Sequence, residues 1–308
     1  MRIRILEPDG FPPAAIATLS GVGEVVQDPL HHAVEPETEA VFIRLANRID
    51  ADFHRQFPRL RWIVSPTTGL DRIDVDYFAA RGIEVISLRG RTDFLDRIHA
   101  TAEHTLALAL ALLRDLPGAA LAVRHGAWDR YPHKGRELFG KRVLLLGYGR
   151  IGRLVAPLFQ AFGCTVRAHD SVAGRVPEAL QCDFPAVLAD TDILSVHLPM
   201  TTATEGFLTA DLIGRLPDHA IVINTARGQV IDQAALLDAI ESGRLAGAAL
   251  DVLADEPDPL SGELLARMEA LGRRLVVTPH IGGFTFESLE MVERFMADVF
   301  VAAARAQA

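Results

Sequence analysis

The chain has 308 residues, of which 49% are hydrophobic and 23% charged, and its formal net charge is −9. This length predicts about two domains, each large enough for its own core, and the negative charge argues against a nucleic-acid or anionic-membrane partner. The longest apolar run, residues 106–113, is too short to span a bilayer, and the N-terminus alternates like a strand rather than a signal peptide. We therefore expect a cytoplasmic protein with two reduced thiols, Cys164 and Cys182, and without a metal site.

Residues 1 to about 97 predict short strands that alternate with helices. Breaks containing proline, glycine or aspartate separate the expected strands, which are residues 3–6, 24–26, 41–43, 62–64 and 84–86. Alternation of strand and helix implies a parallel sheet covered on both faces. This part of the chain has no glycine-rich phosphate-binding motif, so we interpret it as a substrate domain.

A strong helix is predicted over residues 101–116. Its middle, residues 106–113, is apolar all round, which predicts burial on all sides. Pro117-Gly118 is expected to interrupt it before a shorter helical stretch runs to Gly126. An interdomain spine, a subunit contact and an ordinary core helix would all have this pattern.

A glycine-rich turn follows the apolar strand 143–146, and a helix is predicted directly behind it. In the motif, Gly147 permits a tight turn, Gly149 lets the backbone approach a ligand, and Gly152 lets the helix pack against the strand. The unpaired N–H groups at the helix start, with the positive end of the helix dipole, favour an anion. In this context the motif predicts a dinucleotide site.

Asp170 lies where an acid would bind the ribose hydroxyls of the dinucleotide. It ends the predicted strand 165–169, eighteen residues after Gly152. A carboxylate there would repel the 2′-phosphate of NADP, so we expect NAD as the cofactor.

From Gly140 onwards strands and helices alternate regularly. The further expected strands are 193–196, 220–223, 247–252 and 275–278, and the expected helices are 151–161, 209–216, 232–242 and 262–271. In open α/β sheets ligands bind beyond the carboxyl ends of the strands. The polar residues gathered there are Asp170, His197, Arg227, Asp251, Glu256 and His280.

The last predicted helix, 285–306, is amphipathic and follows a glycine-rich hinge. We expect it to return to the first domain, which makes the boundary discontinuous. The predicted domains are 1–98 plus 285–308 for substrate and 99–284 for the cofactor.

Three of the strand-end residues suit the reduction of a small 2-keto acid. Such a reaction needs an acid/base group, a partner for it and a cation for the carboxylate. Arg227, in a turn beside glycine, can bind a carboxylate bidentately. His280 ends an apolar strand before two glycines, and Glu256 would hold its tautomer if the two meet.

Each residue also has a structural alternative. Arg227 could be a surface cation, His280 a satisfied core histidine, and Glu256 part of a solvated acidic loop. His197 suits a cofactor contact or a structural role equally. The remaining histidines considered have no ligand pattern, so we interpret them as non-functional: His31, His32, His104 and His125.

Taken together, the motifs resemble the D-isomer-specific 2-hydroxyacid dehydrogenases. Their order and spacing agree from about Gly69 to the C-terminus. The motifs are Gly147-x-Gly149-x-x-Gly152 with Asp170, His197-Leu198-Pro199 with Thr204, Asn224 to Gly228, Gly247 to Val252, Glu256-Pro257 and Thr278 to Gly283.

The resemblance implies a fold and a set of roles. The fold is α/β with two Rossmann-like domains, a flavodoxin-like substrate domain and a doubly wound NAD-binding domain. Arg227, Glu256 and His280 are implied as substrate binder, acid that tunes the histidine, and general acid/base, and the chain as a homodimer through its cofactor domains. The implied substrate loop is Thr68-Gly69-Leu70, and the implied NAD site adds Arg150, Ile151, Thr225, Ala226, Asp251 and Gly283 to the motif residues above.

Two features bear on the substrate. Related formate dehydrogenases carry Gln at the position of Glu256, so formate is disfavoured. The segment 88–97 is longer than the usual family connection by about five residues and carries Arg89, Arg91 and Arg97. If these arginines face the cleft, the substrate carries an extra anion or a sugar-like tail; otherwise the segment is a solvated loop.

We therefore predict an NAD-dependent oxidoreductase that interconverts a D-2-hydroxy acid and its 2-keto acid. A non-catalytic NAD-sensing interaction protein and a phosphite-type dehydrogenase are the alternatives on the same fold.

Overall fold

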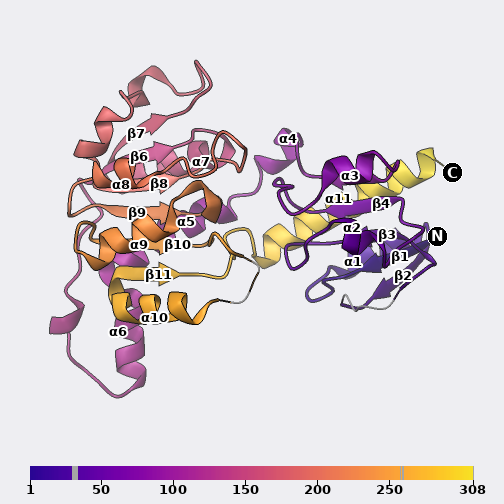
Figure 1. Cartoon of the computed structure of the whole chain (residues 1–308), viewed down its shortest axis with the longest axis horizontal. Coiled ribbons are helices and arrows are strands. Elements are labelled where there is room, and N and C mark those ends of the chain that lie inside the picture. Colours follow the sequence, from indigo (N-terminus) through magenta and orange to yellow (C-terminus); the bar gives the residue numbers. More distant parts are fainter. Residues whose placement is uncertain (30–33, 257, 259, 308) are drawn as a thin grey trace. The chain divides into compact units, whose positions relative to one another are not determined.

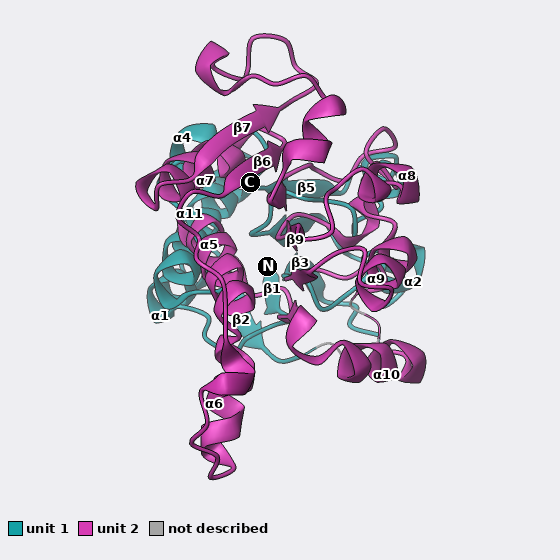
Figure 2. Ribbon diagram, turned by 90° about the vertical axis from the view of Figure 1, so that its left-hand side faces the viewer, with its two compact units in different colours: residues 1–98, 284–308 teal, residues 99–283 magenta. Residues whose placement is uncertain are grey.

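The computed structural model describes residues 1–29, 34–256, 258 and 260–307, so His31, His32 and Pro257 lie outside the described part. The chain divides into two compact units (Figures 1 and 2). Unit 1 comprises residues 1–98 and 284–308, and unit 2 comprises residues 99–283.

Unit 1 is a five-stranded parallel sheet in the order β2-β1-β3-β4-β5. This is the flavodoxin-like order, as predicted. Helices α1 and α11 pack on one face and α2 and α3 on the other. The elements are β1 (Arg2–Ile5), α1 (Pro13–Ser20), β2 (Glu24–Gln27), β3 (Thr38–Phe42), α2 (Ala51–His54), β4 (Trp62–Ser65), α3 (Val75–Ala79), β5 (Glu84–Ser87), α4 (Thr92–Leu95) and α11 (Phe286–Ala306).

The C-terminal helix α11 joins unit 1 through its apolar stripe. Phe300 is fully buried and packs edge-on against Phe42 of β3 and Trp62 of β4. Thr285 caps the helix by accepting a hydrogen bond from the Ser288 N–H. The amphipathic pattern seen in the sequence therefore forms part of the core of the first unit.

Unit 2 is a six-stranded parallel sheet in the order β11-β10-β9-β8-β6-β7. Successive residues of β6 alternate between two cores: Val143 and Leu145 face α5 and α7, and Leu144 and Leu146 face α8 and α9. Its strands are β6 (Arg142–Leu146), β7 (Thr165–His169), β8 (Ile193–Val196), β9 (Ile221–Asn224), β10 (Gly247–Leu250) and β11 (Leu275–Val277).

Helices cover both faces of this sheet, which confirms the predicted doubly wound α/β class. The α-helices are α5 (Ala100–Arg114), α6 (Leu116–Arg124), α7 (Arg150–Ala161), α8 (Ala210–Gly214), α9 (Gln233–Glu241) and α10 (Gly262–Leu271). The short 3-10 helices are η1 (Tyr131–His133), η2 (Glu178–Leu180), η3 (Ala186–Asp190), η4 (Gly228–Val230) and η5 (Gly272–Arg274).

The break in the long apolar helix lies earlier than the sequence predicted. Asp115 adopts a left-handed conformation with φ +49° and ends α5, and its carboxylate accepts a hydrogen bond from His133. Pro117 then lies in the first turn of α6, where its missing N–H costs nothing. The prediction of burial on all sides was also too broad, because Ala107 of α5 is exposed.

Among the described residues, no single helix is long and apolar enough to cross a membrane. The pair α5 and α6, bent by 64°, meets the test of length and composition only when both are taken together.

Candidate active site

The strand order of unit 2 separates the predicted site residues into two neighbouring groups. The glycine turn, Asp170 and His197 follow β6, β7 and β8. Arg227, Glu256 and His280 follow β9, β10 and β11. The glycine turn and these five residues therefore lie at the carboxyl edge of one sheet, where ligands of open α/β folds bind.

The three glycines of the turn differ in conformation and in the space around them. Gly147 has φ +100°, and a Cβ there would lie 2.6 Å from the carbonyl oxygen of His197. A Cβ on Gly152 would lie 2.3 Å from the carbonyl oxygen of Gly147. A Cβ on Gly149 would meet nothing within 4 Å, and no side chain caps α7. The space beside Gly149 at the N-terminus of α7 fits a pyrophosphate.

Asp170 lies beside this turn. Its carboxylate accepts hydrogen bonds from the Tyr148 N–H at 2.9 Å, the Val172 N–H at 2.9 Å, and Arg175 Nη1 at 3.0 and 3.2 Å. Burial opposes its ionisation, but these hydrogen bonds hold the pKa of Asp170 below its usual range. Asp170 is therefore a fixed anion at the position predicted for ribose recognition.

His197 follows β8 and is held in the neutral form. Its Nε2 lies 2.9 Å from Ser195 Oγ, and burial lowers the pKa of His197 to about 3. Its Nδ1 is buried without a hydrogen-bond partner among the described residues. In the loop that follows, Thr204 Oγ1 donates to the Pro199 carbonyl and accepts from the Thr201 N–H.

The turn after β9 presents Arg227. Asn224 clamps this turn, because its side chain accepts from the Ala226 N–H at 3.0 Å and donates to the Arg227 carbonyl at 2.8 Å. Thr225 lies 2.8 Å, Oγ1 to Oγ1, from Thr105 of α5. A Cβ on Gly228 would lie 2.0 Å from the Leu253 carbonyl carbon, so the segment after β10 packs directly on this turn.

His280 and Glu256 meet after β11. His280 Nδ1 lies 2.8 Å from Glu256 Oε1, and the side chains are 22% and 17% exposed. His280 has φ +54°, a left-handed conformation that is uncommon for a residue with a Cβ. Such backbone strain persists only where the surroundings enforce it, and it is concentrated at functional sites.

Asp251 enforces this conformation. Its backbone carbonyl accepts from the His280 N–H at 2.8 Å, and its carboxylate accepts from the Ile281 and Gly282 N–H groups at 2.9 and 2.8 Å. Thr278 Oγ1 also donates to it at 2.6 Å. Burial opposes ionisation, but the hydrogen bonds lower the pKa of Asp251. The side chain that the resemblance assigned to the cofactor is thus engaged in holding the histidine turn.

His104 is the residue of this network that the sequence pattern missed. Its Nε2 lies 3.0 Å from Thr278 Oγ1 and 3.2 Å from Asp251 Oδ1. The residue lies on α5, far from Asp251 in sequence, and only the packing of that helix against β10 and β11 brings them together. Within the described residues, no group of three His, Cys, Asp or Glu side chains is arranged to hold a metal ion.

The predicted substrate loop belongs to unit 1. Thr68, Gly69 and Leu70 follow β4, and Thr67 Oγ1 donates to the Gly69 carbonyl at 2.8 Å. Thr68 is exposed, and Leu70 packs on the core beside α2 and α3. The loop therefore lies at the carboxyl edge of its own sheet.

Comparisons with known proteins agree with this arrangement. Residues 106–282 match the family model of the D-isomer-specific 2-hydroxyacid dehydrogenase NAD-binding domain. The chain is 37% identical over 298 residues to a D-3-phosphoglycerate dehydrogenase of Mycobacterium tuberculosis, which covers 92% of this chain and 53% of that protein. It is 32% identical over 270 residues to a hydroxypyruvate reductase of Thermotoga maritima, with 86% of each chain covered.

A solved structure is similar over nearly the whole length. The D-lactate dehydrogenase of Aquifex aeolicus, in complex with NAD and lactic acid, has a TM-score of 0.83 and 26% identity, with 99% of this chain and 96% of that chain covered. The chain spans about half the length of the phosphoglycerate dehydrogenases it matches.

Proposed function

Because the chain belongs to the D-isomer-specific 2-hydroxyacid dehydrogenases, we propose that it interconverts a small D-2-hydroxy acid and its 2-keto acid with NAD as cofactor. The observation that supports this best is the His280–Glu256 pair at 2.8 Å, on a strained turn that follows β11. When bound, the nicotinamide cofactor supplies or accepts the hydride.

In this proposal His280 is the general acid/base. Glu256 engages Nδ1, so Nε2 is the ring nitrogen that remains to exchange a proton with substrate. In the direction of reduction, protonated Nε2 gives its proton to the keto oxygen; in oxidation, neutral Nε2 takes the hydroxyl proton. Glu256 keeps the ring oriented through its contact with Nδ1.

Arg227 holds the substrate carboxylate in the proposal. A guanidinium can form two parallel hydrogen bonds to a carboxylate. Asn224 fixes the backbone of the turn that carries Arg227. A fixed backbone restricts the positions that the guanidinium can reach. The loop Thr68-Gly69-Leu70 of unit 1, in which Thr68 is exposed, stays a predicted substrate contact.

The proposal is tested by NADH oxidation with a panel of 2-keto acids that includes phosphorylated and sugar acids. We expect turnover with at least one of them, and expect the reverse reaction to use the D-isomer of the product. Tight NADH binding without any turnover would favour the sensor alternative.

The roles of the two residues are tested on the best substrate. His280→Asn should lower kcat by about 10²–10⁴, and Arg227→Ala should raise KM and lower kcat. His125→Asn, at an exposed histidine that follows α6, serves as the control. Full turnover by folded His280→Asn would exclude it as the proton donor.

The proposed enzyme is a homodimer through α6. None of the nine residues of this apolar helix is buried, and Leu121 and Val123 are 54% and 52% exposed. Beyond it, Trp128, Tyr131 and Phe139 are 92%, 79% and 75% exposed. An apolar face of this kind marks an interface.

Light scattering tests the dimer. Leu121→Glu combined with Val123→Glu should give a monomer, whereas Leu265→Glu, at an exposed leucine of α10, should leave the dimer intact. Dimeric Leu121→Glu/Val123→Glu protein would place the interface elsewhere.

A further inference from the structure

The arginine-rich segment 88–97 is an ordered part of unit 1. Phe94 of α4 stacks on Phe295 of α11, with ring centroids 3.9 Å apart and an interplanar angle of 10°. Leu95 and Ile98 are buried in the core beneath α11. These contacts fix the segment, which is therefore more than the solvated loop that the sequence also allowed.

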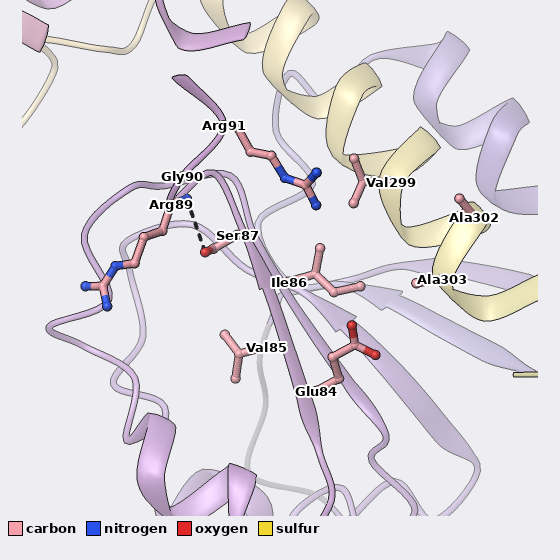
Figure 3. A pocket seen from close by; sticks show the side chains of 10 residues that line it. All are labelled: Glu84, Val85, Ile86, Ser87, Arg89, Gly90, Arg91, Val299, Ala302 and Ala303. Carbon is pink, nitrogen blue, oxygen red and sulfur yellow. Dashed lines mark hydrogen bonds between the residues drawn. The ribbon is translucent and has the colours of Figure 1, made fainter. Parts of the chain in front are cut away.

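Two of its arginines line a cavity of about 590 Å³ between β5 and α11. Figure 3 shows Arg91 reaching over Ile86 toward Val299, whereas Arg89 extends to the other side of β5. Ala302 and Ala303 continue the apolar wall along α11. The volume lies in the range of small-molecule sites, which is roughly 300–1,000 Å³.

The cavity carries charges of opposite sign at its two ends, with Arg91 at one end and Glu84 at the other. Arg89 and Arg91 are both exposed, and neither forms an ion pair with any described residue. At the far end, Glu84 is engaged, because its Oε2 accepts a hydrogen bond from Gln307 Nε2 at 3.0 Å. In a chain of net charge −9, this leaves a cationic end next to an apolar wall.

The edge of β5 adds backbone groups. The Glu84 and Leu88 N–H groups donate to Arg61 and Thr67 on the β4 side, at 2.9 and 3.1 Å. Alternate residues of a strand point their backbone groups to opposite sides, so those of Val85 and Ser87 are directed to the open edge. β5 has only four residues, so a peptide strand could pair with it over a short length only. A small molecule therefore suits the site better than a peptide.

We propose that this cavity binds a small amphiphilic anion, in which a carboxylate or phosphate group contacts Arg91 and a short apolar body lies against Ile86, Val299 and Ala302. A guanidinium pairs well with either oxyanion, and the apolar wall selects against anions that lack a hydrocarbon part. The site belongs to unit 1 alone and does not depend on the reaction proposed for unit 2.

Calorimetric titration with hexanoate and with hexyl phosphate tests the site and separates the two oxyanions. All titrations are made in the Arg227→Ala background, so that the proposed substrate cation does not contribute. We expect at least one probe to bind with 1:1 stoichiometry, and expect acetate and hexanol, which each lack one half of the probe, to bind at least about tenfold more weakly.

Three variants test the location. Arg91→Gln should lower the affinity for the probe by about tenfold or more, because a hydrogen bond to a charged group is lost. Ala302→Leu should weaken probe binding as well, because the larger side chain fills part of the cavity without changing its charge. Arg97→Gln removes an equal charge from the same segment but not from the cavity, and should leave affinity within about twofold.

The proposal would be overturned if neither probe bound at about 10 mM, a concentration far above typical specific dissociation constants. It would also be overturned if Arg91→Gln bound the probe as tightly as the parent protein, or if Arg97→Gln lost as much affinity as Arg91→Gln. Binding of an acidic peptide along β5 without binding of either probe would also replace it with an edge-strand interaction. Circular dichroism confirms that each variant is folded.

Discussion

Each unit has a topological switch point, where the strand order of its sheet reverses. Only in unit 2 is the space at this point left open to a ligand. In unit 1 the strand order reverses between β1 and β3, and in unit 2 between β6 and β8. In unit 1, Glu7 after β1 accepts a hydrogen bond from the Arg44 N–H at 2.7 Å and from the Ala46 N–H at 3.3 Å, and Arg44 pairs with buried Glu293. In unit 2, Gly149 borders open space and no side chain caps α7.

The comparison shows that fold alone does not provide a ligand site. Both sheets direct backbone N–H groups toward the switch point, where an anion is favoured. In unit 1 the Glu7 carboxylate is this anion. In unit 2 no side chain among the described residues occupies the corresponding position beside Gly149, so a ligand can bind there. The presence of a glycine, or of an acid, after the first strand decides between the two.

The largest expected effect is on the architecture of the open turn. Gly147→Ala adds a left-handed strain of about 1–2 kcal/mol and a clash with the His197 carbonyl, so unit 2 should lose about 3 kcal/mol in total. Gly140→Ala is the control: φ is +74° there, but nothing lies within 4 Å of the new Cβ, and we expect about 1 kcal/mol. Denaturant unfolding measures both, and equal losses would show that the close approach has no cost.

The closed switch point should respond to loss of its anion. Glu7→Ala leaves the N–H groups after β3 without their acceptor, which should destabilise unit 1 by about 1–3 kcal/mol and leave NADH affinity unchanged. Trp62 is buried in unit 1, so in a Trp128→Phe background its fluorescence follows that unit. Unchanged stability would mean that water satisfies these groups equally well.

Cofactor choice in the open site should depend on Asp170. Asp170→Asn removes the repulsion of a 2′-phosphate and frees Arg175, which is 43% exposed, to bind one. The preference for NADH over NADPH should fall by about tenfold or more, measured as the ratio of the two dissociation constants. Arg167→Gln, on the strand that Asp170 follows, is the control. An unchanged ratio in Asp170→Asn would assign selectivity to other residues.

The smallest effect is a pH dependence of unit 1. Burial raises the pKa of Glu293, although Arg44 opposes the shift. For a carboxyl whose folded pKa is raised, the stabilising contribution is complete below the unfolded pKa of about 4.3 and is lost as pH rises through the folded pKa. The stability of wild type relative to Glu293→Gln should therefore fall as the pH rises above about 4, measured through Trp62. A difference that does not change with pH would contradict the shift.

The sequence predicted the sheets well because their strands are short, apolar and bounded by turn residues. The glycine roles were also predictable, since each follows from a position relative to strand β6. Asp115 was missed as the helix break because proline gives a stronger sequence signal than a left-handed aspartate held by His133. The breaking contact comes from a residue 18 positions away.

The structure places the predicted site residues at strand ends, but the sequence predicted their contacts only in part. Glu256 and His280 were named from separate strand ends, but their 2.8 Å contact depends on β10 and β11 being neighbours. His104 carried no local pattern, and its place beside Asp251 follows from helix packing. Likewise, only the stacking of Phe94 on Phe295 decides where the arginines of segment 88–97 lie.

Titration of NADH against Gly149→Val tests the open switch point most directly. The new side chain meets no protein atom through its Cβ, so the variant should unfold at the wild-type midpoint while NADH affinity falls by about 100-fold, as expected if the cofactor occupies that space. Gly214→Val, at another glycine with nothing within 4 Å, should keep wild-type affinity. Folded Gly149→Val protein that binds NADH as tightly as wild type would contradict the placement of the cofactor at this turn.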